Sequence, residues 1–67
     1  MTPIDDPRPF REVLRDWMTR HQLDWPGAMH MLGMASRQTL AIALAGRPIR
    51  YERAQRALMT LVDEGRA

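Results

Sequence analysis

The 67-residue chain contains no cysteine and no lysine, and only 6% of its residues are aromatic. Without cysteine the fold has neither a disulfide nor a thiolate metal cluster, and this composition fits a reducing compartment. The longest apolar run, residues 40–45, is far shorter than the ~20 residues that cross a bilayer, so we expect no membrane segment. The first residues carry acids and prolines instead of a basic start and an apolar stretch. We therefore expect no signal peptide and a cytoplasmic protein.

Length and composition predict one small domain. Apolar residues make up 45% of the chain, which is enough for one core and leaves nothing of domain size over. At this length the free energy gained by burial nearly cancels the loss of chain entropy. We therefore expect an additional source of stability, and a homodimer is the simplest one.

Positive charge is concentrated in one part of the chain. Residues 1–34 carry four arginines and five acids, residues 35–56 five arginines and one glutamate, and residues 57–67 one arginine and two acids. The three segments therefore have net charges of −1, +4 and −1, and the excess lies in the middle one. Such a cluster attracts phosphate groups, whereas a charge that serves solubility alone is spread over the surface. The exclusive use of arginine also has a second explanation, a genome rich in G and C.

The first nine residues differ in composition from the rest. Three of the five prolines lie in residues 1–9 together with Asp5 and Asp6, and we expect a flexible N-terminal arm there. The predicted domain spans residues 10–64, and residues 65–67 form a C-terminal tail.

Two helices are predicted in the first half of the domain. From Phe10 to about Gln22 apolar residues recur at the spacing of one helical face, which predicts the first helix. The residues of this face are Phe10, Val13, Leu14, Trp17 and Met18, with His21 one turn on. A second helix over 25–32 has Asp24 as its N-cap and a proline in its first turn, and Gly33 ends it in the left-handed conformation.

Two further helices complete the prediction. Ser36 caps the third, which ends at Gly46 with Pro48 beyond, and the fourth begins near Tyr51 and stops at Gly65. The residues expected to face inward from the fourth helix are Tyr51, Ala54, Ala57, Leu58, Leu61 and Val62. Those expected to face outward are Glu52, Arg53, Arg56, Asp63 and Glu64. Four helices and no strand pattern predict an all-α fold, a small four-helix bundle.

The third helix carries the strongest functional signal. We expect Leu40 at the centre of its buried face, with Ala43 and Leu44 beside it. The residues that then point outward are Gln38, Ile42 and Ala45, with Thr39 at the margin. An outward glutamine and aliphatic group are typical of a helix that reads the major groove of DNA, where glutamine bonds adenine and an aliphatic side chain touches the thymine methyl. The alternative is a helix that packs on both faces and leaves Arg37 solvated.

Groups around this helix are expected on the DNA backbone. The helix N-terminus, capped by Ser36, presents N–H groups and its positive dipole end to phosphate. Arg47 and Arg50, in the loop that follows, are expected on phosphates as well. Arg53 and Arg56 either join them on the DNA backbone, or lie on a solvated face, or pair within their helix with Glu52 and its neighbours.

The stretch from Leu14 to Leu61 resembles the Cro/phage-repressor (XRE-like) helix-turn-helix family. The matching segments are Leu32-Gly33-Met34 at the end of the first motif helix, Ser36 to Leu40 entering the recognition helix, Leu44-Ala45-Gly46 closing it, and the basic loop into a fourth helix. The spacing from Gly33 to Leu40 is one residue longer than is usual in the family, which leaves the register of the base contacts open by one position.

The resemblance implies a Cro/lambda-repressor-like fold and a bacterial or phage-encoded transcription regulator. Such a protein is a homodimer that binds double-stranded DNA at a palindromic operator, typically as a repressor and often of its own gene. On matching positions, Arg37, Gln38 and Ile42 fall among the base-contacting residues. Thr39 falls on a backbone-contacting position, and Trp25 falls where the family commonly has a polar residue on phosphate.

Other classes of function have less in their favour. His21 and His30 lack cysteine partners and close spacing, so we expect no metal site and no cofactor. We see no catalytic constellation and expect no enzyme. A different class stays open, a small helical protein-interaction module that uses Met29 to Met34 or an apolar edge of the fourth helix. It would act as an adaptor or phage-type inhibitor, or as an activator contacting RNA polymerase. For the homodimer we expect an interface at Leu61 and Val62 near the C-terminus, or otherwise at the N-terminal arm.

Overall fold

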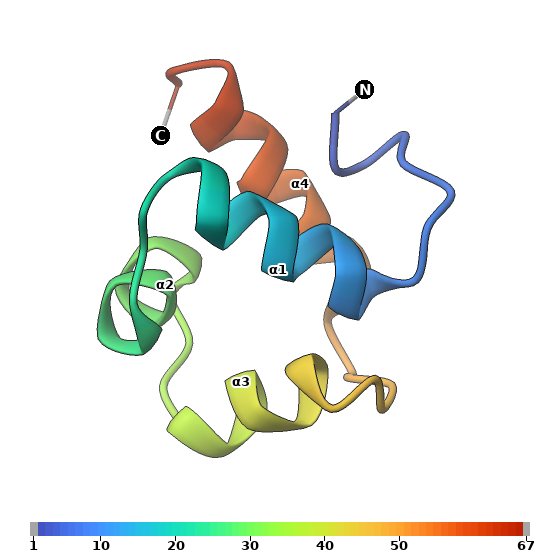
Figure 1. Ribbon diagram of the computed structural model, residues 1–67, viewed down its shortest axis with the longest axis vertical. Coiled ribbons are helices and arrows are strands. Elements are labelled where there is room, and N and C mark those ends of the chain that lie inside the picture. The colour runs from blue at the N-terminus through green and yellow to red at the C-terminus, as the bar shows by residue number, and fades with distance from the viewer. Residues whose placement is uncertain (1, 67) are drawn as a thin grey trace.

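Four α-helices make up the regular structure of residues 2–66, the part of the chain that the computed structural model describes (Figure 1). They are α1 (Phe10–Arg20), α2 (Trp25–Leu32), α3 (Arg37–Leu44) and α4 (Glu52–Asp63). No β-strand occurs within residues 2–66, so the all-α prediction is confirmed. None of these helices is long and apolar enough to cross a membrane.

The helix α1 forms the centre of the core. The five apolar residues of its predicted face, from Phe10 to Met18, are all buried, and Trp17 is fully so. The helix ends at Arg20, two residues earlier than predicted, because Gln22 adopts a φ of 53° and reverses the chain. The amide of Leu23 then donates to the Met18 carbonyl at 2.8 Å, which is the bond of a Schellman-type end.

The helix α2 begins and ends as its sequence predicts. The Asp24 carboxylate accepts a hydrogen bond from the Gly27 amide at 2.8 Å, which satisfies one free N–H of the first turn. Gly33 closes the helix with a φ of +65°, and the amide of Met34 donates to the Met29 carbonyl at 2.9 Å. The chain therefore turns sharply between α2 and α3.

The helix α3 packs on α1 and α2 and lies at the end of the molecule away from the last turn of α4 (Figure 1). Leu40 and Ala43 face the core and are essentially fully buried. The Ser36 hydroxyl accepts from the Gln38 amide at 3.1 Å, as expected of an N-cap. Gly46 follows the helix with a φ of +84°, so the chain leaves α3 at a turn that favours glycine.

The helix α4 is rotated about its axis relative to the prediction. Its fully buried residue is Met59, with Leu58 and Val62 packed partly against the core. Of the residues predicted to face inward, Tyr51 is 65% and Leu61 is 37% exposed, so the prediction was wrong for these two. Ala54, also predicted inward, is exposed as well.

The charged residues of α4 explain the rotation. Arg56 and Asp63 were predicted to face solvent, but each has a side chain only 13% exposed. Both find partners that belong to other segments of the chain: Asp63 meets the end of α1, and Arg56 meets the N-terminal residues. Because these ion pairs and hydrogen bonds offset the high cost of burying a charge, the helix turns both residues inward and leaves part of its apolar side exposed.

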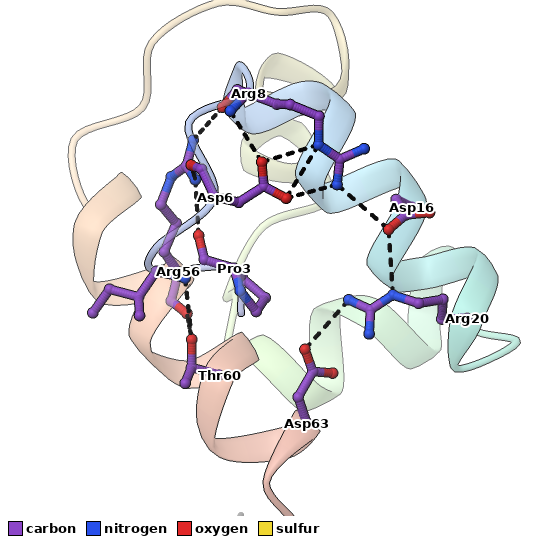
Figure 2. A network of polar contacts seen from close by, with 9 residues as sticks. Pro3, Asp6, Arg8, Asp16, Arg20, Arg56, Thr60 and Asp63 are labelled. Carbon is purple, nitrogen blue, oxygen red and sulfur yellow. Dashed lines mark hydrogen bonds and ion pairs between the residues drawn. The ribbon is translucent and has the colours of Figure 1, made fainter. Parts of the chain in front are cut away.

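Residues 2–9 lie against α4, where the sequence predicted a flexible arm. The Arg56 guanidinium donates from Nη1 to the carbonyl oxygens of Pro3 at 2.8 Å and Asp6 at 3.0 Å, and from Nη2 to that of Arg8 at 2.9 Å (Figure 2). The pyrrolidine of Pro3 is fully buried. Three carbonyls held by one guanidinium fix the path of this segment.

A chain of ion pairs crosses the outer side of α1 (Figure 2). Arg8 contacts Asp16 at 3.5 Å, Arg20 contacts Asp16 at 3.3 Å, and Arg20 reaches Asp63 at 3.3 Å. The imidazole of His21 also lies 2.6 Å from an Asp63 oxygen. These contacts join the N-terminal segment, α1 and the end of α4.

Candidate functional site

The outward side of α3 presents most of the predicted base-contacting residues. Arg37 and Gln38 are exposed in its first turn, and Ile42, one turn on, is half-buried. Thr39 is half-buried at the margin and Ala45 is exposed, as the helical spacing predicts. Leu40 and Ala43 are the fully buried residues of α3, and Leu44 packs partly against the core. Within residues 2–66 no other segment covers Arg37 and Gln38, which are exposed.

Arg37 is supported by an aromatic ring from α2. Its guanidinium carbon lies 5.0 Å from the centre of the Trp25 ring, within the range of a cation–π interaction. Trp25 is half-buried and packs against the core, and Pro26 and Met29 line the same hollow. Trp25 therefore covers the core with one part of its ring system and stacks against the Arg37 guanidinium.

The loop after α3 forms the wall of a shallow groove beside Ile42. The residues that line this groove are Thr39, Ile42, Pro48, Ile49, Arg50, Tyr51 and Gln55. Ile49 anchors the loop by packing against the core, while Arg50 and Tyr51 are exposed. The sequence analysis missed Tyr51 as a site residue because its apolar spacing placed it inside the bundle.

Arg47 lies on the other side of the same loop. It shares a hollow of about 500 Å³ with Arg11 from the first turn of α1 and with Gly46. The Arg11 side chain lies directly over Gly46, where a Cβ would come 2.9 Å from its Cδ. Arg11 is a second cation at this position and was not among the predicted site residues, because it lies 36 residues before Arg47 in the chain and only the fold brings the two together.

The two other arginines of the basic segment have different surroundings. Arg56 is held by the N-terminal carbonyls and lies 3.7 Å from Glu52, so it has the paired environment that the sequence offered as one option. Arg53 is exposed.

Basic groups thus lie at both ends of α3. Arg37 and the positive end of the helix dipole are at its start, and Arg47 and Arg50 follow its end. The eight residues of α3 that lie between the two groups of charge span about 12 Å. The side between them carries neutral side chains only.

Within residues 2–66 the structure has no cluster of three or more His, Cys, Asp or Glu side chains placed to hold a metal ion. His21 contacts Asp63 and lies beside the Trp17 ring, with ring centres 5.2 Å apart, whereas His30 is exposed. His21 therefore joins two helices.

Comparison of the chain with protein-family models, with curated proteins and with solved structures finds no match. The resemblance to the Cro/phage-repressor family stays a prediction from the sequence.

Proposed function

We propose that this protein is a sequence-specific DNA-binding transcription regulator of the helix-turn-helix class, a homodimeric repressor of an inverted-repeat operator. In this proposal α2 and α3 are the two helices of the motif, and α3 enters the major groove. One observation carries it: α3 exposes Gln38 on the side opposite its core and Arg37 at its N-terminus, with arginines at both of its ends.

Base recognition follows from the donors and acceptors of these side chains. Gln38 bonds the N6 and N7 edge of an adenine, and Ile42 contacts a thymine methyl group. Arg37 bonds the O6 and N7 edge of a guanine, or a phosphate beside it. Because Arg37 rests on the Trp25 ring, its guanidinium keeps one orientation and loses less rotamer freedom on binding.

Backbone contacts fix the position of α3 in the groove. The major groove is about 12 Å wide, close to the length of α3, so charges beyond its two ends come near phosphates of opposite strands. We place Arg47 and Arg50 on one strand and the Ser36 end of the helix on the other. Thr39 and the indole N–H of Trp25 supply further neutral hydrogen bonds to phosphate or sugar.

The operator follows from the symmetry of the protein. A homodimer places two copies of α3 in successive major grooves, about 34 Å apart, on inverted half-sites. Each α3 then lies about 17 Å from the two-fold axis. This distance fits within a protomer whose extents are 27 × 23 × 19 Å.

The experiment is selection of bound duplexes from a random pool, followed by anisotropy titrations at several salt concentrations. We expect an inverted-repeat consensus and, for about three phosphates per protomer, a log–log salt slope near −5 for the dimer. Arg37→Ala and Gln38→Ala relax base preference at one or two operator positions at a cost of about 1–3 kcal/mol, whereas Arg47→Ala weakens all sequences alike.

The matched control is Arg15→Ala, which removes the same charge from the exposed face of α1. Selection that yields no consensus, or binding without salt dependence, contradicts the proposal.

The protein-interaction module is the second candidate function, and Met29 to Met34 is one of the two surfaces expected for it. Of the three methionines in its expected surface, Met34 is buried, Met29 is half-buried, and Met31 is 37% exposed. A contact of the bound regulator with RNA polymerase would be centred on Met31.

A further inference from the structure

Large apolar side chains are exposed mainly on one side of the molecule. Within residues 2–66 the exposed ones are Ile4, Met31, Tyr51 and Leu61. Ile4 and Tyr51 line one hollow together with Ala54 and Ala57, and Leu61 lies one turn further along the same side of α4. We call Ile4, Tyr51, Ala54, Ala57 and Leu61 the α4 outer face.

This face is held in place by the rest of the fold. The amide of Ile4 donates to the Thr60 hydroxyl at 3.2 Å, and Pro3 beside it is buried. On the opposite side of α4, Met59 is fixed in the core. An apolar surface that is rigid before binding loses little conformational freedom when it is covered, which favours association.

Charges of both signs border the face, Arg50 and Arg53 at the start of α4 and Glu64 at its end. Arg53 and Glu64 are eleven residues apart, close to three helical turns, so they lie on the same side and about 16 Å apart. Among residues 2–66 Arg53 has no ion-pair partner, and Glu64 meets only Arg66, at 3.5 Å in an exposed pair. Both charges oppose the helix dipole, because the arginine is at the positive end and the glutamate at the negative end.

We propose that the α4 outer face is the interface between two copies of this chain, packed with their α4 helices antiparallel about a two-fold axis. The inference supplies the partner surface that the proposed operator-binding dimer requires. In this arrangement Arg53 of each copy lies opposite Glu64 of the other, and the two helix dipoles oppose one another. The face is therefore complementary to itself, as an interface with two-fold symmetry must be.

The side chains fit this arrangement in size. Ala54 and Ala57 leave a depression between the larger residues, and the antiparallel register brings Leu61 of the second copy over it. One helix face is a small interface, at or below about 1,200 Å² in total. We expect a dissociation constant in the micromolar range.

Pairing through this face leaves most of the DNA-binding side accessible. Arg37, Gln38 and Arg47 do not belong to the α4 outer face, whereas Arg50 lines the same hollow and Tyr51 is shared with the groove beside Ile42. Val62, one of the two residues expected at an interface from the sequence, packs against the core, whereas Leu61 is part of the face.

Sedimentation equilibrium of the full chain without DNA, from about 1 μM to 1 mM, tests the interface. We expect a monomer–dimer equilibrium. Arg53→Glu and Glu64→Arg each weaken dimerisation about tenfold or more, because each places like charges opposite one another twice per dimer. The double variant that exchanges the two charges restores the dissociation constant to within about threefold of the original.

Two controls keep the outcome clear. Arg15→Glu makes the same change of charge on α1 and leaves dimerisation unchanged, and circular dichroism of each variant verifies that it is folded. A chain that is monomeric at 1 mM, or dimers unaffected by both single exchanges, overturns the inference.

Failure of the interface is distinct from failure of the proposed function. If the chain stays monomeric but selects a half-site sequence that depends on Arg37, DNA binding stands and the α4 interface falls. If the charge exchange behaves as expected while no duplex is bound, the interface stands and the proposed function falls.

Discussion

The guanidinium of Arg56 lies over the ring of Phe10, with 5.4 Å between its central carbon and the ring centre. The same group donates three hydrogen bonds to carbonyls of the N-terminal segment. One side chain of α4 therefore covers the start of α1 and fixes the residues that precede it. Three predictions about stability and one about recognition follow from contacts of this kind.

Replacement of Arg56 should loosen the N-terminal segment. Arg56→Ala removes a partly buried cation with three charge-assisted bonds and should lower the free energy of unfolding by about 2–4 kcal/mol, measured by urea denaturation. Arg56→Lys keeps the charge but not the planar fork, so it should recover less than half of the loss. Arg53→Ala, on the exposed side of α4, serves as control and should change stability by less than about 0.5 kcal/mol in dilute, monomeric protein. Equal effects at both positions would contradict this account.

Asp6 gives the stability a defined dependence on pH. The Arg8 side chain, and then the Arg8 backbone N–H, donate to its carboxylate and lower its pKa from 3.8 to about 2. Because the pKa is lower in the folded state, the stabilisation is complete above the unfolded value and is lost as pH falls from about 4 to about 2. Asp6→Asn removes the carboxylate, so its melting temperature should fall less than that of the parent protein as pH is lowered from about 4 to about 2. Thermal unfolding at these pH values measures the difference. If the melting temperatures of Asp6→Asn and the parent protein differ by the same amount at pH 6 and at pH 2, this account of Asp6 is contradicted.

Asp63 should be the most sensitive residue at the end of α4. Asp63→Ala leaves His21 and Arg20 without the carboxylate that they share, at 2.6 and 3.3 Å. We expect a loss of about 1–3 kcal/mol in the free energy of unfolding. Glu64→Ala, one residue further and exposed, should cost less than about 0.5 kcal/mol in dilute, monomeric protein. If Asp63→Ala lowers the free energy of unfolding by less than Glu64→Ala does, the contact of Asp63 with α1 contributes nothing to stability.

Trp25 and Arg37 should act as one unit in DNA binding. Trp25→Leu preserves the apolar cover of the core but removes the aromatic face under Arg37. In a double-mutant cycle with Arg37→Ala, the two binding losses should be less than additive by about 0.5–1 kcal/mol. Trp25→Phe keeps a ring and should retain part of the coupling while losing any bond from the indole N–H. Strict additivity would mean that the stacked geometry has no part in binding.

The structure confirms the parts of the sequence analysis that depend on neighbouring residues. Asp24 and Ser36 cap their helices and Gly33 ends α2 in the left-handed conformation, as predicted. Caps and glycine turns act over three or four residues, so the chain contains all the information they need. With Leu40 facing the core, helical geometry turns Gln38 outward, and Arg37 is exposed because it is the first residue of α3.

The sequence by itself determined where the helices lie, which side of α1 is buried, and where the arginines gather. Tertiary structure alone decided which side of α4 faces the core and whether residues 2–9 are free. Polarity predicted Arg56 and Asp63 outside, yet each is turned inward by partners more than 40 residues away in the chain. A pattern of polar and apolar residues cannot show such pairs, because the cost of burying a charge depends on a partner that only the folded chain brings near.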